Sequence, residues 1–109
     1  MTTIESLKSA VAAFRDERDW AQFHTPKNLA IAISVEASEL LELFLWRDES
    51  DRVPPERLSA AEQEMADVFI YLVSLADALD VDLGEAVKRK LQLNAEKYPK
   101  ETSRGSTKK

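Results

Sequence analysis

The chain has 109 residues, 44% of them hydrophobic, no cysteine, and a formal net charge of −5. This length fits one small domain; the missing cysteines exclude disulfides, thiolate metal sites and a cysteine nucleophile, and an acidic body argues against broad binding to nucleic acid. Without a signal-peptide pattern or an apolar stretch long enough to span a bilayer, we expect a cytoplasmic protein with no membrane contact.

The first predicted helix begins near Thr2, because Thr2 and Glu5 have the spacing of a capping box. Hydrophobic residues then recur at helical spacing until the charged run RDERD, which ends the helix before Trp20. The segment AQFHTP is predicted to be a linker.

The second predicted helix begins after Thr25, a favourable N-cap, with Pro26 at the first helical position, and runs to Phe44 or Trp46. Its hydrophobic residues cover much of the circumference, so we expect this helix to be central. The next segment, RDESDRVPPERL, is predicted to be a loop because its adjacent prolines disfavour a continuous helix.

Two more helices follow. Ser59 and Glu62 form a second capping-box pattern, which begins a helix that runs to about Leu79. Its predicted core stripe consists of Met65, Val68, Phe69, Leu72, Leu75 and Leu79. Asp82 and Glu85 begin the last helix, which Pro99 ends. The pattern predicts an all-α domain over residues 1–99 and a basic, flexible tail over 100–109. So small a core makes oligomers plausible.

Two pairs of carboxylates interrupt the hydrophobic helices. Glu36 and Glu39 lie in VEASELLELF, and Glu64 and Asp67 lie in EQEMADVFIYL. Residues three apart share a helix face, so each pair directs two acids at one point. Neither segment has a Lys or Arg on that face, and burying unpaired charges is costly. A bound cation would resolve this conflict.

The ligand chemistry favours a hard cation. Carboxylate oxygens suit Mg²⁺ first and Mn²⁺ second. Four acids exceed the charge of one such ion, which indicates more than one ion or one acid kept as a general base. The alternative is that the acids form a solvated face of a non-catalytic helical interaction module, since exposed Glu at this spacing is common.

At this point the sequence resembles a known family. Glu36-Ala-Ser-Glu39, followed after 24 residues by Glu64-Met-Ala-Asp67, is similar to the ExxE and ExxD signature of the MazG-like all-α nucleoside triphosphate pyrophosphohydrolases. The segments ERDWAQFHTPKNL, LFLW, DVFIYL and KLQLNAEKYP resemble the dCTP pyrophosphatase subgroup in particular. The resemblance covers most of the chain, from about Phe14 to Pro99.

The resemblance implies a four-helix-bundle-like fold, assembled as a homodimer or homotetramer with the pocket near a subunit interface. It also implies Mg²⁺-dependent hydrolysis of a nucleoside triphosphate to the monophosphate and pyrophosphate. The implied substrate is dCTP or a related deoxynucleotide, with dUTP or a damaged nucleotide as alternatives. The role would be sanitation of the nucleotide pool.

The resemblance also assigns residues. Glu36, Glu39, Glu64 and Asp67 match the metal ligands, and Glu39 is a candidate base for the attacking water, although the sequence does not separate it from Glu36. The positions that match nucleotide contacts are Trp20, His24, Trp46, Tyr71, Lys90 and Asn94, with Lys97 and Tyr98 as weaker matches. Independently, Trp20, Phe23 and Trp46 flank the second helix, and Lys90 and Asn94 share one face of the last helix.

Overall fold

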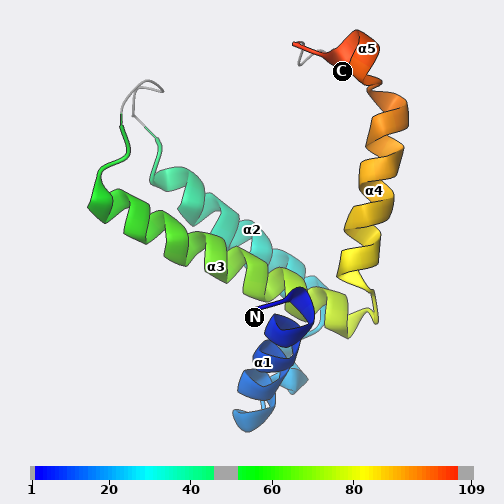
Figure 1. Ribbon diagram of the computed structural model, residues 1–109. Helices are drawn as coiled ribbons and strands as arrows, with labels where there is room; N and C mark the ends of the chain where they lie inside the picture. The colour runs from blue at the N-terminus through cyan, green and yellow to red at the C-terminus, as the bar shows by residue number, and fades with distance from the viewer. Residues whose placement is uncertain (1, 46–51, 106–109) are drawn as a thin grey trace.

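A computed structural model describes residues 2–45 and 52–105 of the chain (Figure 1). All regular structure in these two ranges is helical, which confirms the predicted all-α class. The elements are α1 (Ile4–Glu17), the 3₁₀ turn η1 (Ala21–Phe23), α2 (Pro26–Glu42), α3 (Pro55–Ala78), α4 (Leu83–Lys97) and α5 (Lys100–Ser103).

Two helix starts lie where the sequence predicts them. The Thr25 side chain accepts a hydrogen bond from the backbone N–H of Asn28 at the start of α2. The Asp82 side chain accepts one from the N–H of Glu85 at the start of α4. Each cap satisfies a backbone donor that has no partner within the helix.

Two other starts differ from the prediction. Helix α1 is capped by Thr3, not Thr2, because Thr3 and Ser6 exchange hydrogen bonds in a reciprocal capping box. Helix α3 begins at Pro55, four residues before the predicted start at Ser59. The prolines therefore begin the helix instead of extending the loop, because proline at the first helical position lacks only an N–H that would have had no helical partner.

The helices form an antiparallel pair with two additions (Figure 1). Helices α2 and α3 lie side by side along their length, and α1 packs against α3. Helix α4 leaves the end of α3 and projects away from the pair, with α5 at its tip. The described residues of one chain therefore do not form a closed bundle of four helices.

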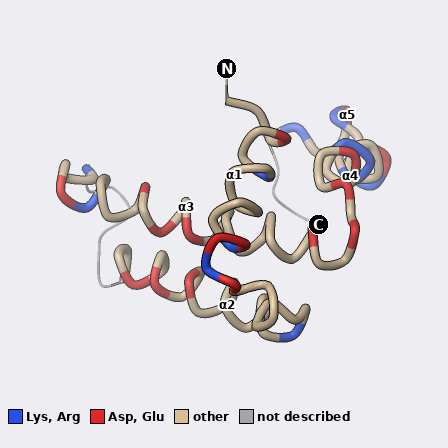
Figure 2. The backbone as a smooth tube through the Cα atoms, turned by 90° about the horizontal axis from the view of Figure 1, so that it is seen from below, with Lys and Arg blue, Asp and Glu red and all other residues tan. Residues whose placement is uncertain are grey.

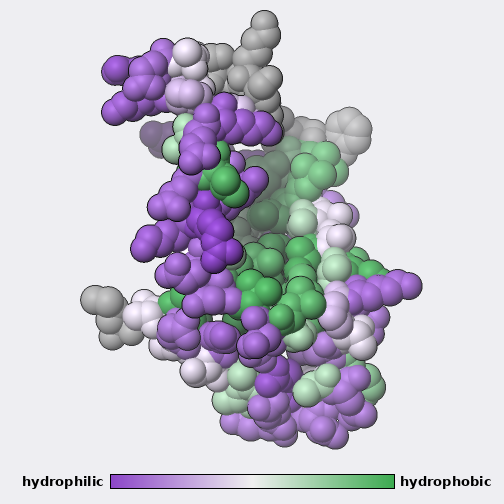
Figure 3. All heavy atoms as spheres, turned by 90° about the vertical axis from the view of Figure 1, so that its right-hand side faces the viewer, coloured by the Kyte–Doolittle hydropathy of each residue, from purple (hydrophilic) through white to green (hydrophobic). Residues whose placement is uncertain are grey.

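The buried core is small. Among the described residues, the buried hydrophobic side chains are Leu29, Ala61, Val73 and Ala76. The stripe predicted as the core of α3 is wrong in part for a single chain, since Met65, Leu72 and Leu79 are exposed. Figure 3, which views the molecule from the α4 side, shows hydrophobic side chains gathered in a band open to solvent.

The dimensions of the chain agree with this open arrangement. Its radius of gyration is 17.1 Å, whereas a compact domain of this length has a radius of about 13 Å. Its accessible surface is 8879 Å², whereas a compact monomer of this mass exposes roughly 6,100 Å². The difference is as large as the area that permanent subunit interfaces bury.

The C-terminal segment contains one helical turn, α5, where the sequence predicts only a flexible tail. Pro99 separates it from α4, as expected for a residue that cannot continue a helix. No helix in the described part of the chain is long and apolar enough to cross a membrane.

Candidate metal centre and adjoining pocket

Three of the four predicted acids converge between α2 and α3. Glu36 projects from α2, and Glu64 and Asp67 project from consecutive turns of α3. One carboxylate oxygen from each residue lies within 4.8 Å of the other two. Figure 2 shows that acidic segments lie along both helices of this pair. The shared face predicted for Glu64 and Asp67 and the antiparallel packing of α2 on α3 produce this convergence.

The surroundings of Glu36 and Glu64 oppose the ionisation of these two carboxyls. The neighbouring carboxyl of Glu39, followed by loss of water contact and the carboxyl of Glu64, raises the pKa of Glu36 to about 7. Loss of water contact is the main cause that raises the pKa of Glu64. Glu36 is therefore protonated more readily than an ordinary glutamate when no cation is bound.

Two oxygens of the cluster lack any partner. Glu36 Oε2 and Glu64 Oε2 are buried without a hydrogen bond, and no salt bridge of the described residues involves Glu36, Glu64 or Asp67. A buried acceptor normally has a partner, so these oxygens require one that the protein itself does not provide. A divalent cation with oxygen ligands fits this donor set.

Glu39 differs from the other three acids. It is exposed and is not part of the group within 4.8 Å, although it lies close enough to raise the pKa of Glu36. The structure therefore distinguishes Glu36, which belongs to the three-acid group, from Glu39, which does not; the sequence alone could not distinguish them.

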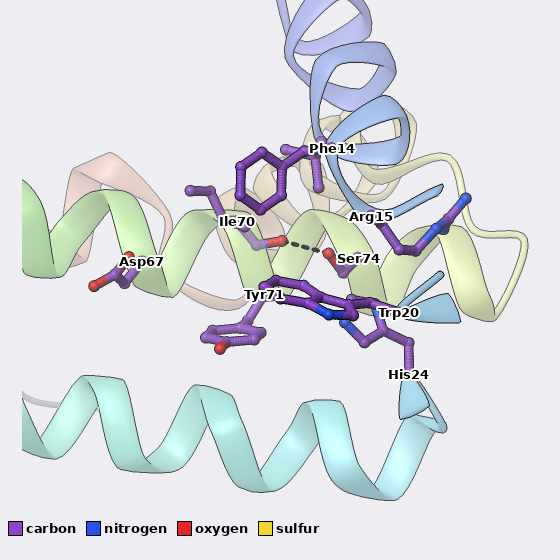
Figure 4. A pocket seen from close by; sticks show the side chains of 9 residues that line it. Phe14, Arg15, Trp20, His24, Asp67, Ile70, Tyr71 and Ser74 are labelled. Carbon is purple, nitrogen blue, oxygen red and sulfur yellow. Dashed lines mark hydrogen bonds between the residues drawn. The ribbon is translucent and has the colours of Figure 1, made fainter. Parts of the chain in front are cut away.

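A cavity of about 230 Å³ adjoins the acids, between α1, the segment before α2, and α3 (Figure 4). Three of the predicted nucleotide contacts, Trp20, His24 and Tyr71, line it. Asp67 lines it as well, so the cavity and the acid cluster share a residue. Asp67 and Tyr71 are four residues apart on one face of α3, which makes the aromatic cavity continuous with the acids.

The turn after α1 sets the position of Trp20. Asp19 adopts a left-handed conformation, with a φ of 53°, and the Trp20 N–H donates to the carbonyl of Arg15 at 3.1 Å. This geometry is a common helix C-terminus, usually with glycine in the left-handed position. It brings the ring of Trp20 edge-on to that of Phe14, with centroids 5.8 Å apart.

His24 offers an unused polar atom beside the cavity. Its Nδ1 is buried and has no hydrogen-bond partner. Figure 4 shows His24 beside Trp20, with Tyr71 on the side of the Trp20 ring that lies toward Asp67. A planar ligand between these rings would find both stacking surfaces and a hydrogen-bonding group.

The remaining predicted contacts are not brought to this cavity within one chain. Lys90 and Asn94 lie on α4, outside the cavity lining, and Lys90 is exposed. Lys97 and Tyr98 lie at the end of the same helix. Trp46 lies outside the described residues.

Sequence reasoning missed five further residues that line the cavity, namely Val11, Phe14, Arg15, Ile70 and Ser74. Ser74 had a detectable signal, since it lies on the same stripe of α3 as Asp67 and Tyr71. Phe14 and Arg15 had none, because their place depends on how α1 packs against α3.

The fold and the site together define a class, that of small all-α proteins with a carboxylate cluster able to hold a metal ion between two antiparallel helices and an aromatic pocket beside it. A sequence profile of the MazG-like family matches residues 31–109. The chain therefore belongs to the MazG-like family.

Individual relatives agree with this assignment. The chain is 44% identical over 108 residues to dCTP pyrophosphatase 1 of Mus musculus, covering 95% of this chain and 64% of that protein. It is 41% identical over 111 residues to the Homo sapiens protein of the same name, covering 98% and 65%. The chain thus spans less than two thirds of the length of these curated relatives.

A solved structure is similar over almost its whole length. The crystal structure of a pyrophosphatase from Archaeoglobus fulgidus DSM 4304 has a TM-score of 0.84 and 46% sequence identity to this chain. The match covers 91% of this chain and 94% of the other. The similarity therefore includes the helices that carry the acids.

Proposed function

We propose that this protein is a Mg²⁺-dependent nucleoside triphosphate pyrophosphohydrolase whose preferred substrate is dCTP or a closely related deoxynucleotide. Water attacks the α-phosphorus, the bond to the bridging oxygen breaks, and the products are the nucleoside monophosphate and pyrophosphate. The name shared by the curated relatives, dCTP pyrophosphatase 1, supports the choice of substrate.

One observation carries the proposal. Glu36, Glu64 and Asp67 gather three oxygens within 4.8 Å, and Asp67 also lines an aromatic cavity. A nucleotide has the same two parts, a planar base and an anionic phosphate chain. With the base between Trp20 and Tyr71, its phosphates would extend along α3 toward the acids.

The unpartnered oxygens of Glu36 and Glu64 make the cluster fit a bound cation. Magnesium is the first choice and manganese the second, because all the available ligands are carboxylates. When bound, the metal would neutralise phosphate charge and lower the pKa of a water molecule. Glu36, Glu64 and Asp67 would hold it.

Glu39 is the proposed general base. It is exposed and outside the three-acid group, so its carboxylate stays available to accept a proton from the attacking water. Glu36 is the weaker candidate, because its oxygen is part of the cluster that would hold the metal. Trp20, His24 and Tyr71 would orient the nucleobase. Asp67, which lines the cavity and belongs to the acid cluster, would align the phosphates with the metal.

The assay that tests this function measures pyrophosphate release from a panel of dNTPs and NTPs with Mg²⁺. We expect dCTP to be hydrolysed fastest. Glu64→Gln should reduce kcat/KM more than about 100-fold, since mutation of residues that only hydrogen-bond to metal ligands already reduces activity about 10–100-fold. Glu62→Gln is the matched control, because Glu62 is an exposed acid of the same helix outside the cluster. Faster turnover of dUTP would change the substrate but not the reaction.

The absence of turnover for every nucleotide would favour the alternative of a non-catalytic interaction module. Melting curves with and without Mg²⁺ separate these functions further, because only a protein that binds the ion in its folded state is stabilised by it. We expect Mg²⁺ to raise the melting temperature of the wild type and to leave Glu64→Gln unchanged.

The protein is also proposed to act as a homodimer or homotetramer. The extra exposed area, the projecting α4 and the uncovered hydrophobic band support assembly. In such an oligomer, α4 of one subunit would bring Lys90 and Asn94 to the pocket of another. The proposed substrate also favours a cytoplasmic location, which cell fractionation would test.

A further inference from the structure

Helix α1 supplies one wall of the pocket but is weakly held. Phe14 and Arg15 line the cavity from this helix, yet none of its residues is fully buried. Its main packing partner is α3. In the described ranges, the only side-chain hydrogen bond that joins two different α-helices runs from Arg15 Nη1 to Asp77 Oδ2, at 2.7 Å.

The ion pair that this bond forms is partly shielded from water. The Arg15 side chain is 18% exposed and that of Asp77 is 35% exposed, whereas Asp16, the second partner of Arg15, is 61% exposed. Exposed ion pairs contribute little to stability, and partial shielding strengthens the attraction. The Asp77 pair is therefore the one that can hold α1 against α3, and the Asp16 pair is internal to α1.

Arg15 also holds Trp20 through its backbone. The Arg15 carbonyl accepts the N–H of Trp20, so the two residues move together. In Figure 4 the Arg15 side chain extends away from the rings of Trp20 and Tyr71 and does not reach between them. Arg15 therefore borders the cavity without entering the space between these rings, and we expect it to act on a ligand through the position of Trp20.

We propose that the Arg15–Asp77 ion pair is a latch that docks α1 on α3 and sets the position of Trp20, and so determines nucleotide affinity without taking part in hydrolysis. The proposal rests on the proposed function for its kinetic readout. Arg15 and Asp77 are positioning residues in this scheme. The acids lie on α2 and α3, which pack together without α1, so the latch leaves the reacting centre intact.

The kinetic test compares Asp77→Asn and Arg15→Met with the wild type, using dCTP and Mg²⁺. Loss of a charge-assisted hydrogen bond should raise KM roughly five- to twentyfold while kcat stays within about twofold. Arg15→Met keeps the apolar stem at the cavity wall. The double variant should be no worse than the poorer single variant, since both changes remove one interaction.

Two variants sharpen the result. Asp16→Asn removes the exposed partner of Arg15 and should leave KM within about twofold of the wild type. Arg15→Lys keeps the charge and should recover part of the lost affinity. A fall in kcat with KM unchanged, or an equal effect of Asp16→Asn, would overturn the proposal.

Hydrogen–deuterium exchange tests the latch without relying on activity. In Asp77→Asn, the amides of residues 11–24 should exchange faster, while those around Glu36 and Glu64 should keep their wild-type rates. Unchanged exchange in residues 11–24 would refute the latch even in an active enzyme. If the wild type hydrolyses no nucleotide but Asp77→Asn still shows the faster exchange in residues 11–24, the proposed function is refuted and the latch is supported.

Discussion

The two ends of this chain are stabilised in different ways. Helices α2 and α3 bury side chains against each other and carry the acids, and α1 packs on α3 and lines the cavity although none of its own residues is buried. The arm formed by α4 and α5 has no buried residue, and its Leu91 is 63% exposed. The comparison indicates that the acid cluster is assembled within one chain, whereas the apolar residues of the arm are left uncovered by the described residues of that chain.

Complementation between two inactive variants is the strongest test of whether α4 completes the pocket of a neighbouring chain. Glu64→Gln lacks a proposed metal ligand, and Lys90→Gln lacks the lysine of α4 that is predicted to contact the nucleotide. If α4 completes a neighbour's pocket, refolding an equal mixture of the two should restore activity to about a quarter of the wild-type sites, since each intact site needs acids from one variant and α4 from the other. A mixture as inactive as its components would contradict this role of the arm.

A charge on the apolar face of the arm is expected to have the next largest effect. Leu91→Glu should dissociate the proposed oligomer, weakening assembly by at least ~2 kcal/mol, because it would bury an unpaired carboxylate in an apolar interface. Analytical ultracentrifugation would measure the change. Lys88→Glu, which also adds an acid to an exposed position of α4, is the control and should leave the assembly intact.

The pH dependence of stability tests the acid cluster. The pKa of Glu36 rises from 4.5 to about 7 on folding, so between these values the folded chain binds more protons than the unfolded chain. The free energy of unfolding should therefore decrease as the pH rises from 5 to 8 in the absence of metal. Mg²⁺ should stabilise the protein more at pH 8 than at pH 5.5, because its ligands must be deprotonated.

Thermal melts at the two pH values, with and without Mg²⁺, measure this coupling. The Glu36→Gln variant should show a weaker dependence on both pH and Mg²⁺. An equal Mg²⁺ effect at both pH values would contradict the assignment of Glu36 to the site.

The smallest expected effect lies at the junction of the two regions. Asp80 ends α3 in a left-handed conformation, with a φ of 55°. Asp80→Gly should increase the free energy of unfolding by about 0.5 kcal/mol, since glycine adopts this conformation without a steric penalty. Denaturant melts would detect it, and Asp82→Ala, which removes the cap of α4, should act in the opposite direction.

Much of the fold follows from local sequence. Thr25 and Pro26, and likewise Asp82, fix helix starts through short-range hydrogen bonds that single segments encode. The start of α3 could not be predicted from the sequence. The pair Pro54-Pro55 is compatible with a loop and equally with the first turn of a helix, and only the structure shows that the helix begins at Pro55. The exposure of Met65 and Leu72 could not be predicted from the sequence either, because periodicity identifies an apolar helix face without indicating whether the same chain covers it.

The site divides in the same way. The spacing of Glu64 and Asp67 predicts that their carboxylates share a face, and packing on α2 adds Glu36. Phe14 and Arg15 join the pocket only through the approach of α1 to α3, which no local pattern encodes. Lys90 and Asn94 share a face as predicted, but helical spacing does not specify which subunit that face contacts.

The central claim is that the acids between α2 and α3 bind a divalent cation. The most direct test is to measure Mn²⁺ binding to the wild type, Glu64→Gln and Glu62→Gln by calorimetry or electron paramagnetic resonance. Because Mn²⁺ shares the oxygen ligands of Mg²⁺, we expect at least one ion per chain in the wild type and in Glu62→Gln, and a large loss of affinity in Glu64→Gln. Equal binding by the two variants, or none by the wild type, would contradict a metal centre between α2 and α3.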